Sequence, residues 1–185
     1  MTWIIILIIL AILVIAVVAI YNKLIRLRNT VKSSWSDIDV QCKKRYDLVP
    51  NLVETVKGYA SHEKAVFEKV TQARAMAMQA NSPAEMAKAE NMIRDTLKSL
   101  FAVAEAYPEL KANANFMQLQ TQLQELENSI EYARRYYNAV VRDFNVLIES
   151  FPSNLIASQF NFKQAELFQL EAPETERKPV KVSFS

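Results

Sequence analysis

The chain has 185 residues, a formal net charge of +2 and a single glycine, Gly58. Antiparallel sheets rely on glycine for hairpin turns and bulges, so this composition argues against them. Phosphate-binding and dinucleotide-binding loops need several glycines and are excluded as well. The small net charge gives no argument for binding nucleic acid. The one cysteine has no partner for a disulfide within the chain.

Residues 3–20 predict a transmembrane helix, because all of them are apolar and none is glycine or proline. At 1.5 Å per residue they span ~27 Å, close to the hydrocarbon thickness of a bilayer. Trp3 and Tyr21 bracket the segment at the positions that amphipathic aromatic side chains favour. A cleaved signal peptide is the alternative, but no basic residue precedes the segment and no small-residue cleavage site follows it. We expect residues 1–21 to be a retained anchor.

Four basic residues follow the anchor before the first acidic residue, Asp37: Lys23, Arg26, Arg28 and Lys32. The positive-inside rule then predicts that the rest of the chain lies in the cytoplasm. These residues only set the orientation of the anchor or, as the alternative, also bind the membrane surface. In the second case each residue contributes about 1 kcal/mol of binding free energy through attraction to anionic headgroups.

Residues 22–150 predict a helical bundle, because strong helix formers dominate them. A first row of apolar positions, spaced by three and four residues, runs from Val31 to Ala77 and is interrupted by Arg45 and Glu63. Since the row continues through Pro50, we expect one long helix kinked there, with two helices as the alternative. Each of the two charges is expected to find an opposite charge on a neighbouring helix.

Two more helices are predicted further along the chain. Ser82, Pro83 and Glu85 have the spacing of a helix start with a capping box, and Pro108 interrupts the helix that follows. The last long helix has an unbroken apolar row from Phe116 to Leu147. Helices with one apolar face must bury that face on one another. The sequence therefore predicts an all-α fold, in which the membrane helix precedes an antiparallel bundle of three or four helices.

The last part of the chain lacks this periodicity. Residues 151–170 are apolar but aperiodic, and we expect them to pack on the bundle or on the membrane. Residues 171–185 contain two prolines and mixed charge and are expected to be a disordered tail.

No pattern of residues predicts catalysis. His62 is the only histidine, and a partly exposed helical histidine is favoured over a metal ligand. Cys42 lies in the first apolar row and is expected to be a buried structural thiol rather than a nucleophile. Tyrosines and arginines at 132–137 divide between a core face and a solvated face, so no nucleic-acid site is expected. We predict no catalytic residue, no metal, no cofactor and no enzymatic activity.

Several segments of the sequence resemble the bacterial LemA family. They are 35–41 (WSDIDVQ), 45–53 (RYDLVPNLV), 56–59 (VKGY), 62–63 (HE), 136–138 (YYN) and 151–154 (FPSN). The resemblance extends to about Phe162 and implies a single-pass membrane protein with a long helical bundle and without an assigned enzymatic activity. It also directs attention to Arg45, Asp47, Pro50 and Asn51, as a kink with a polar network.

These features predict a membrane-anchored helical scaffold in the bacterial inner membrane. Apolar rows longer than one bundle needs can pair between copies as coiled coils, so we expect a homo-oligomer that organises or remodels the cytoplasmic face of the lipid bilayer. The alternative is a binding adaptor that presents the bundle to a membrane peptidase or another envelope protein.

Overall fold

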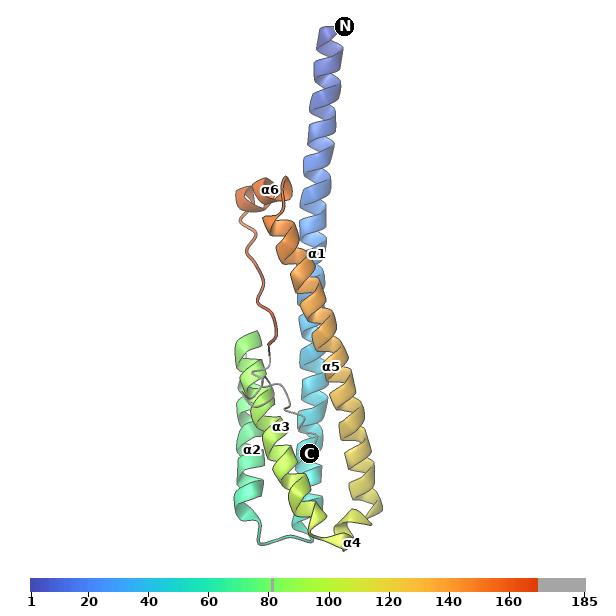
Figure 1. Ribbon diagram of the computed structural model, residues 1–185, viewed down its shortest axis with the longest axis vertical. Coiled ribbons are helices and arrows are strands. Elements are labelled where there is room, and N and C mark those ends of the chain that lie inside the picture. The colour runs from blue at the N-terminus through green and yellow to red at the C-terminus, as the bar shows by residue number, and fades with distance from the viewer. Residues whose placement is uncertain (81, 170–185) are drawn as a thin grey trace, which may run out of the picture. The chain divides into compact units, whose positions relative to one another are not determined.

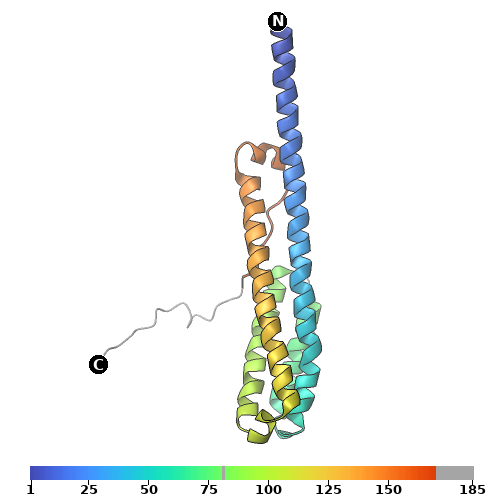
Figure 2. The same ribbon diagram turned by 90° about the vertical axis from the view of Figure 1, so that its right-hand side faces the viewer.

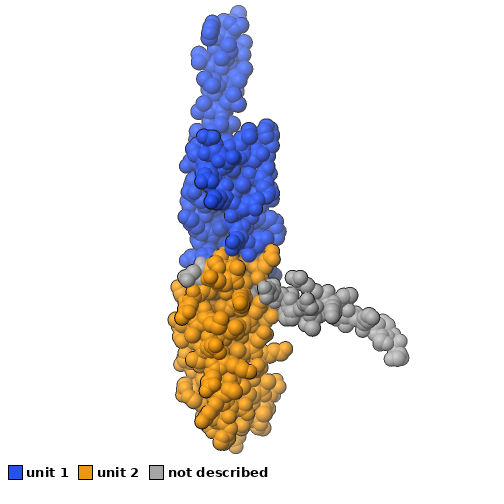
Figure 3. All heavy atoms as spheres, turned by 90° about the vertical axis from the view of Figure 1, so that its left-hand side faces the viewer, with its two compact units in different colours: residues 1–42, 127–167 blue, residues 43–126, 168–185 orange. Residues whose placement is uncertain are grey.

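The computed structural model describes residues 1–80 and 82–169, and these residues form helices and connecting segments without a β-strand. The helices are α1 (Thr2–Lys57), α2 (Lys64–Gln79), α3 (Pro83–Glu105), α4 (Pro108–Lys111), α5 (Ala114–Glu149) and α6 (Ser153–Gln159) (Figure 1). The predicted all-α fold is confirmed. The helices make two compact units (Figure 3). Unit 1 contains residues 1–42 and 127–167, and unit 2 is built on residues 43–126.

Unit 1 pairs the first part of α1 with the last part of α5, and the two helices run antiparallel (Figure 2). The large side chains of residues 3–18 are exposed, and Leu24 is the first fully buried residue of α1. The core of the unit consists of Leu24, Val31, Ile38 and Cys42 from α1 and Ile130, Tyr137, Val140, Val141 and Phe144 from α5. Apart from Leu24, which stands seven residues before the first row begins, these residues belong to the two predicted apolar rows or stand one position beside them.

A short helix and a strap complete unit 1. After α6, Asn161 has a φ of 55°, which reverses the chain. The backbone N–H of Asn161 donates to the Ser158 carbonyl at 3.2 Å, and that of Phe162 donates to the Ala157 carbonyl at 2.9 Å. These two bonds are a Schellman motif, and its usual apolar contact is present because Phe162 and Ala157 are both buried. The turn therefore sends residues 162–167 back along α5.

Unit 2 contains the end of α1, the helices α2, α3 and α4, and the beginning of α5 (Figure 1). Consecutive long helices run in opposite directions, as short connections require. The α3 face predicted from the sequence is buried throughout: Met86, Ala89, Ile93, Leu97, Leu100 and Ala104. α1 and α2 contribute buried apolar residues to the same unit, among them Leu52, Val56 and Val70, so unit 2 has a core of its own.

The expected single long helix, kinked at Pro50, is two helices separated by a turn that begins at Gly58. Pro50 lies inside α1 on its exposed side, whereas α1 ends at Lys57 and α2 begins at Lys64. Glycine is the weakest helix former apart from proline, which accounts for the position of the break. Glu63 precedes α2 and is only half-buried, so the expectation of a buried charge at Glu63 is wrong.

The predicted start and end of α3 are confirmed. The Ser82 hydroxyl accepts a hydrogen bond from the backbone N–H of Glu85 at 3.2 Å, and Pro83 occupies the first turn of the helix. The helix ends at Glu105, before Pro108, and the connection to α5 contains the single turn of α4.

Candidate functional site

The apolar stretch of α1 has the properties of a membrane span. α1 is long and apolar enough to cross a bilayer, and none of its most hydrophobic eighteen-residue window is buried in the structure. In a soluble protein, a helix of this hydropathy would be covered by other parts of the chain. The stretch therefore fits a membrane anchor. It continues into the buried part of α1 without a break in the helix.

The four basic residues after the anchor are all exposed. At 3.6 residues per turn, Lys23 and Arg26 point to one side of α1, and Arg28 and Lys32 point to the opposite side. They form a collar around the helix rather than a stripe. The Arg28 guanidinium lies over the Phe162 ring, 5.2 Å from its centroid, so the end of the C-terminal turn contacts this collar.

Aromatic rings connect the end of the apolar stretch to the turn after α6. The Tyr21 ring is 4.7 Å from that of Phe160 and 6.0 Å from that of Phe162, between centroids. Phe162 in turn packs edge-on against Phe144, at 6.4 Å. These contacts fix α6 beside the residue at which the apolar stretch ends.

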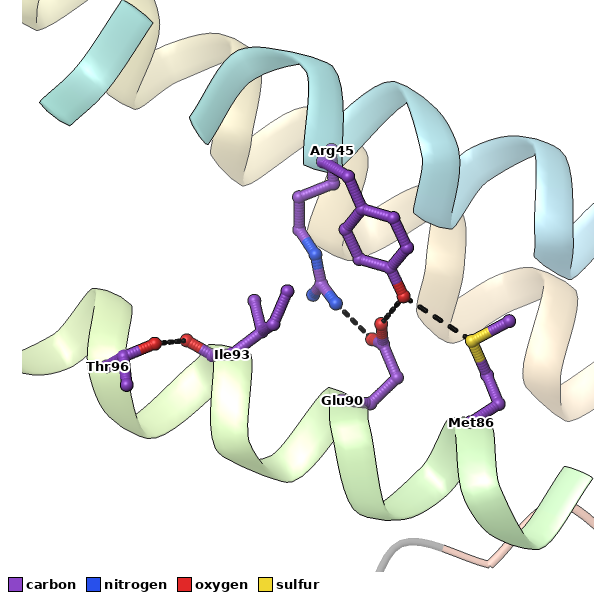
Figure 4. Close-up of polar contacts among 6 residues, drawn as sticks. Arg45, Met86, Glu90, Ile93 and Thr96 are labelled. Carbon is purple, nitrogen blue, oxygen red and sulfur yellow. Dashed lines mark hydrogen bonds and ion pairs between the residues drawn. The ribbon is translucent and has the colours of Figure 1, made fainter. Parts of the chain in front are cut away.

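A buried polar cluster joins α1 to α3 within unit 2 (Figure 4). The Arg45 guanidinium forms an ion pair with the Glu90 carboxylate, and both side chains are almost fully buried. The Tyr46 hydroxyl donates to the second oxygen of Glu90 at 2.5 Å and lies 3.4 Å from the Met86 sulfur. Both oxygens of the Glu90 carboxylate therefore have donors. The expected opposite charge for Arg45 exists, and it is Glu90.

Arg74 of α2 adds a third helix to the cluster. Its Nε donates to the backbone carbonyl of Tyr46 at 2.7 Å. This carbonyl can accept a side-chain donor because Pro50, four residues later, has no backbone N–H to offer it. Pro50 thus opens a hydrogen-bonding position on α1 that Arg74 fills. The cluster holds α1, α2 and α3 at one register, which is a structural role.

The other side chains of the expected kink network make no contact in this cluster, and Pro50 acts only by leaving the Tyr46 carbonyl open to Arg74. Asp47, Pro50 and Asn51 are exposed, on the side of α1 away from the buried Arg45. The Asn51 carbonyl accepts the Thr55 hydroxyl at 2.8 Å. The partners that sequence reasoning missed are Glu90, Tyr46 and Arg74. The sequence does indicate that Glu90 is buried, because this residue stands four positions after Met86 and three before Ile93, on the apolar face of the helix.

Cys42 is buried as its pattern predicts, whereas His62 lies in a turn and not in the expected helix. Cys42 is fully buried and free of any disulfide. His62 is exposed in the turn between α1 and α2. Among residues 1–80 and 82–169, no group of three or more His, Cys, Asp and Glu side chains is placed to hold a metal ion.

The strap of residues 162–167 is held to α5 by polar contacts. The Asn145 side chain donates to the Ala165 carbonyl and accepts from the Ala165 backbone N–H, both at 2.9 Å. The Tyr137 hydroxyl donates to the Glu166 carbonyl at 2.8 Å, and its ring packs against that of Trp35 at 5.6 Å. Burial, and to a smaller extent the negative charge of Glu166, raises the pKa of Tyr137 above its ordinary value of 10.0.

The fold and the uncovered apolar helix define a membrane-associated helical protein. The profile of the LemA family matches residues 34–184. The chain is 30% identical over 166 residues to Protein LemA of Metamycoplasma hominis, an alignment that covers 88% of this chain and 74% of that protein. The chain therefore belongs to the LemA family, as its sequence segments suggested.

The chain is also similar to magnetosome proteins. It is 25% identical over 175 residues to Magnetosome protein MamQ 1 of Paramagnetospirillum magneticum and 22% identical over 174 residues to Magnetosome protein MamQ of Magnetospirillum gryphiswaldense. In both cases, the alignment covers 80% of this chain and 64% of the relative. The chain thus spans just under two thirds of these relatives. Neither the family nor these relatives carry the name of an enzyme.

Proposed function

We propose that the chain is a membrane-anchored, non-enzymatic scaffold that assembles with copies of itself and organises the cytoplasmic face of the bacterial inner membrane. The continuity of α1 carries the proposal. One helix, Thr2–Lys57, contains both the uncovered apolar stretch and the face that is buried from Leu24 onwards. A helix, rather than a flexible linker, joins the bundle to its anchor. The way in which bundles pack on one another therefore determines how their anchors are arranged in the membrane.

The exposed side of α5 in unit 1 supports self-assembly. Tyr132 and Tyr136 are 68% and 55% exposed and stand four residues apart, so both lie on one face of the helix. Aromatic residues are enriched in protein interfaces, where their large rings are buried at a small cost in conformational entropy. A second copy of the chain that covers this face would bury both rings. The basic collar supports a membrane surface with anionic lipids as the other partner.

Purification of the full chain in lipid nanodiscs or mild detergent tests the proposal. A scaffold is expected to form a large, symmetric assembly of one polypeptide, visible by light scattering and electron microscopy. Tyr132→Ser with Tyr136→Ser should reduce the size of this assembly while leaving the helix content unchanged. A protein that remains monomeric in lipid at high concentration would contradict the scaffold function.

The anchor is tested separately. The full chain should remain in the membrane fraction after carbonate extraction, and a chain without residues 1–21 should be released. Release of the full chain by carbonate would mean that the apolar stretch does not span the membrane.

An adaptor is the second candidate function, and a groove in unit 2 favours it. The groove has a volume of about 600 Å³ and lies between the end of α1 and the first three turns of α2. Val53 and Phe67 form its apolar floor, while charged side chains such as Glu54, Lys57 and Glu68 line its rim. This arrangement suits an amphipathic helix of a membrane peptidase or another envelope protein. A monomeric chain that retains one such protein through purification, and loses it with Phe67→Ala, would favour the adaptor.

A further inference from the structure

The turn that contains α6 exposes more apolar surface than a soluble bundle needs. We call residues 151–160 the α6 corner. Phe151, Leu155 and Phe160 in this corner are 81%, 62% and 53% exposed. Three exposed large apolar side chains within ten residues are a higher density than the scattered single exposures that are ordinary on protein surfaces.

The location of the α6 corner identifies what covers it. Phe160 packs on Tyr21, with 4.7 Å between the ring centroids, and Tyr21 directly follows the apolar residues 3–20. Figures 1 and 2 show α6 across the end of α5, beside the part of α1 from which the apolar stretch projects. If residues 3–20 cross the bilayer, Tyr21 stands at its interface. The ring contact then places the α6 corner at the same depth.

The charge distribution fits this depth. No residue from 150 to 162 carries a charge, and the nearest charged side chains in the sequence are Glu149 and Lys163. The exposed basic residues Lys23, Arg26 and Arg28 stand within two turns of Tyr21 on α1. Apolar side chains at the boundary between headgroups and acyl chains, with cations at the level of the phosphates, are the pattern of interfacial membrane binding.

We propose that the α6 corner is a second membrane attachment, which inserts Phe151, Leu155 and Phe160 into the leaflet that α1 leaves at Tyr21. The inference rests on the proposed function, because it requires residues 3–20 to span the bilayer. A single helix crossing a membrane is free to rotate about its axis. A second contact on one side of that helix fixes the rotation and the tilt, so the exposed face of α5 takes one orientation relative to the membrane plane.

Lipid-based quenching of a fluorescent label tests the second attachment. The full chain with Cys42→Ala receives one new cysteine, labelled with the dye NBD, and is reconstituted into vesicles of phosphatidylcholine and phosphatidylglycerol. Leu155→Cys reports on the α6 corner. Glu131→Cys is the matched control, because its side chain is 61% exposed and it lies on α5 of unit 1, ~27 Å along the helix from Glu149. Ile12→Cys reports on the anchor.

We expect lipids with a nitroxide near the headgroup to quench the label at residue 155 several-fold more strongly than the label at residue 131. Equal, weak quenching of 155 and 131 by the headgroup nitroxide, with strong quenching of residue 12 by a nitroxide deep in the acyl chain, would overturn the second attachment and leave the anchor intact. Weak quenching at residue 12 by lipids with a nitroxide deep in the acyl chain would overturn the anchor itself. A label at 155 that is shielded from the lipid nitroxide but self-quenches between copies would assign the α6 corner to a second copy of the chain, and would also overturn the proposal.

Discussion

The ion pair between Arg45 and Glu90 offers the sharpest test of the fold. The two side chains are 2% and 5% exposed, and the second carboxylate oxygen of Glu90 accepts the Tyr46 hydroxyl at 2.5 Å. Glu90→Gln keeps the size of the side chain and an oxygen for Tyr46, but removes the negative charge. Arg45 then retains its positive charge in a buried position without the carboxylate. Unit 2 is expected to lose stability because the desolvation of Arg45 is no longer offset.

The size of the loss follows from the burial of the pair. Breaking a buried ion pair by removing one partner costs about 3–5 kcal/mol. In a protein of this size, each kcal/mol lowers the melting temperature by roughly 2–4 °C. We therefore expect Glu90→Gln to lower the melting temperature by roughly 6–20 °C. Arg45→Met combined with Glu90→Gln should recover much of the loss, because no buried charge remains.

An exposed ion pair of the same kind provides the control. Lys57 Nζ and Glu54 Oε1 are 3.1 Å apart, and the side chains are 52% and 71% exposed. Glu54→Gln is the same chemical change in solvent and should change the free energy of unfolding by less than about 1 kcal/mol. Thermal unfolding of the three variants, followed by far-UV circular dichroism, measures the difference. Equal melting temperatures for Glu90→Gln and Glu54→Gln would refute the buried pair.

Three further predictions concern topology, the anchor and pH. In a Cys42→Ala background, His62→Cys should react with a membrane-impermeant maleimide only after cell lysis; reaction in intact cells would place the bundle outside. Deleting residues 1–21 should leave a soluble domain with a strongly helical circular dichroism spectrum, and a spectrum of coil would contradict this. The raised pKa of Tyr137 means that its hydrogen bond to the strap stabilises the fold below pH 10 and is lost as the pH rises through the folded-state pKa. In a Trp3→Phe protein, quenching of Trp35 emission by the Tyr137 phenolate should therefore have a midpoint above pH 10, and Tyr137→Phe should remove it.

Apolar periodicity predicted which residues are buried, but not where the chain reverses. The row from Val31 to Ala77 continues across residues 58–63, and Val70, Ala73 and Ala77 are buried as it predicts. The spacing of apolar residues records which face of a helix is covered, and a connection of suitable length preserves that spacing. A reversal between two helices therefore leaves no gap in the row. Gly58 was the local signal for the break, and the more familiar helix breaker, Pro50, obscured it.

The sequence predicted that Arg45 has a buried partner of opposite charge, but not that this partner is Glu90. A charge at Arg45 within an apolar row requires a partner, and this requirement follows from desolvation alone. Which residue meets it depends on how α1 and α3 are aligned, and the sequence of one helix carries no information on its register against another. Glu63 shows the limit of the same reasoning, because the row that assigned it to a buried position crosses a turn.

In the α6 corner, the feature of the sequence that agrees with membrane contact is the absence of charged residues. A helix of seven residues is too short to display a period, so residues 151–162 gave no prediction of orientation.

The place of residues 151–162 follows from helix lengths within unit 1. Trp35 packs on Tyr137, and the two helices run antiparallel. From Trp35 back to Tyr21, α1 rises ~21 Å, and from Tyr137 to Glu149, α5 rises ~18 Å. The end of α5 thus reaches the level of Tyr21, and the next residues meet the end of the anchor. Two uncharged segments, 3–20 and 150–162, are far apart in sequence, and the second lies beside the end of the first. A bundle surface in water has no need of that coincidence, whereas a second contact with the bilayer requires it.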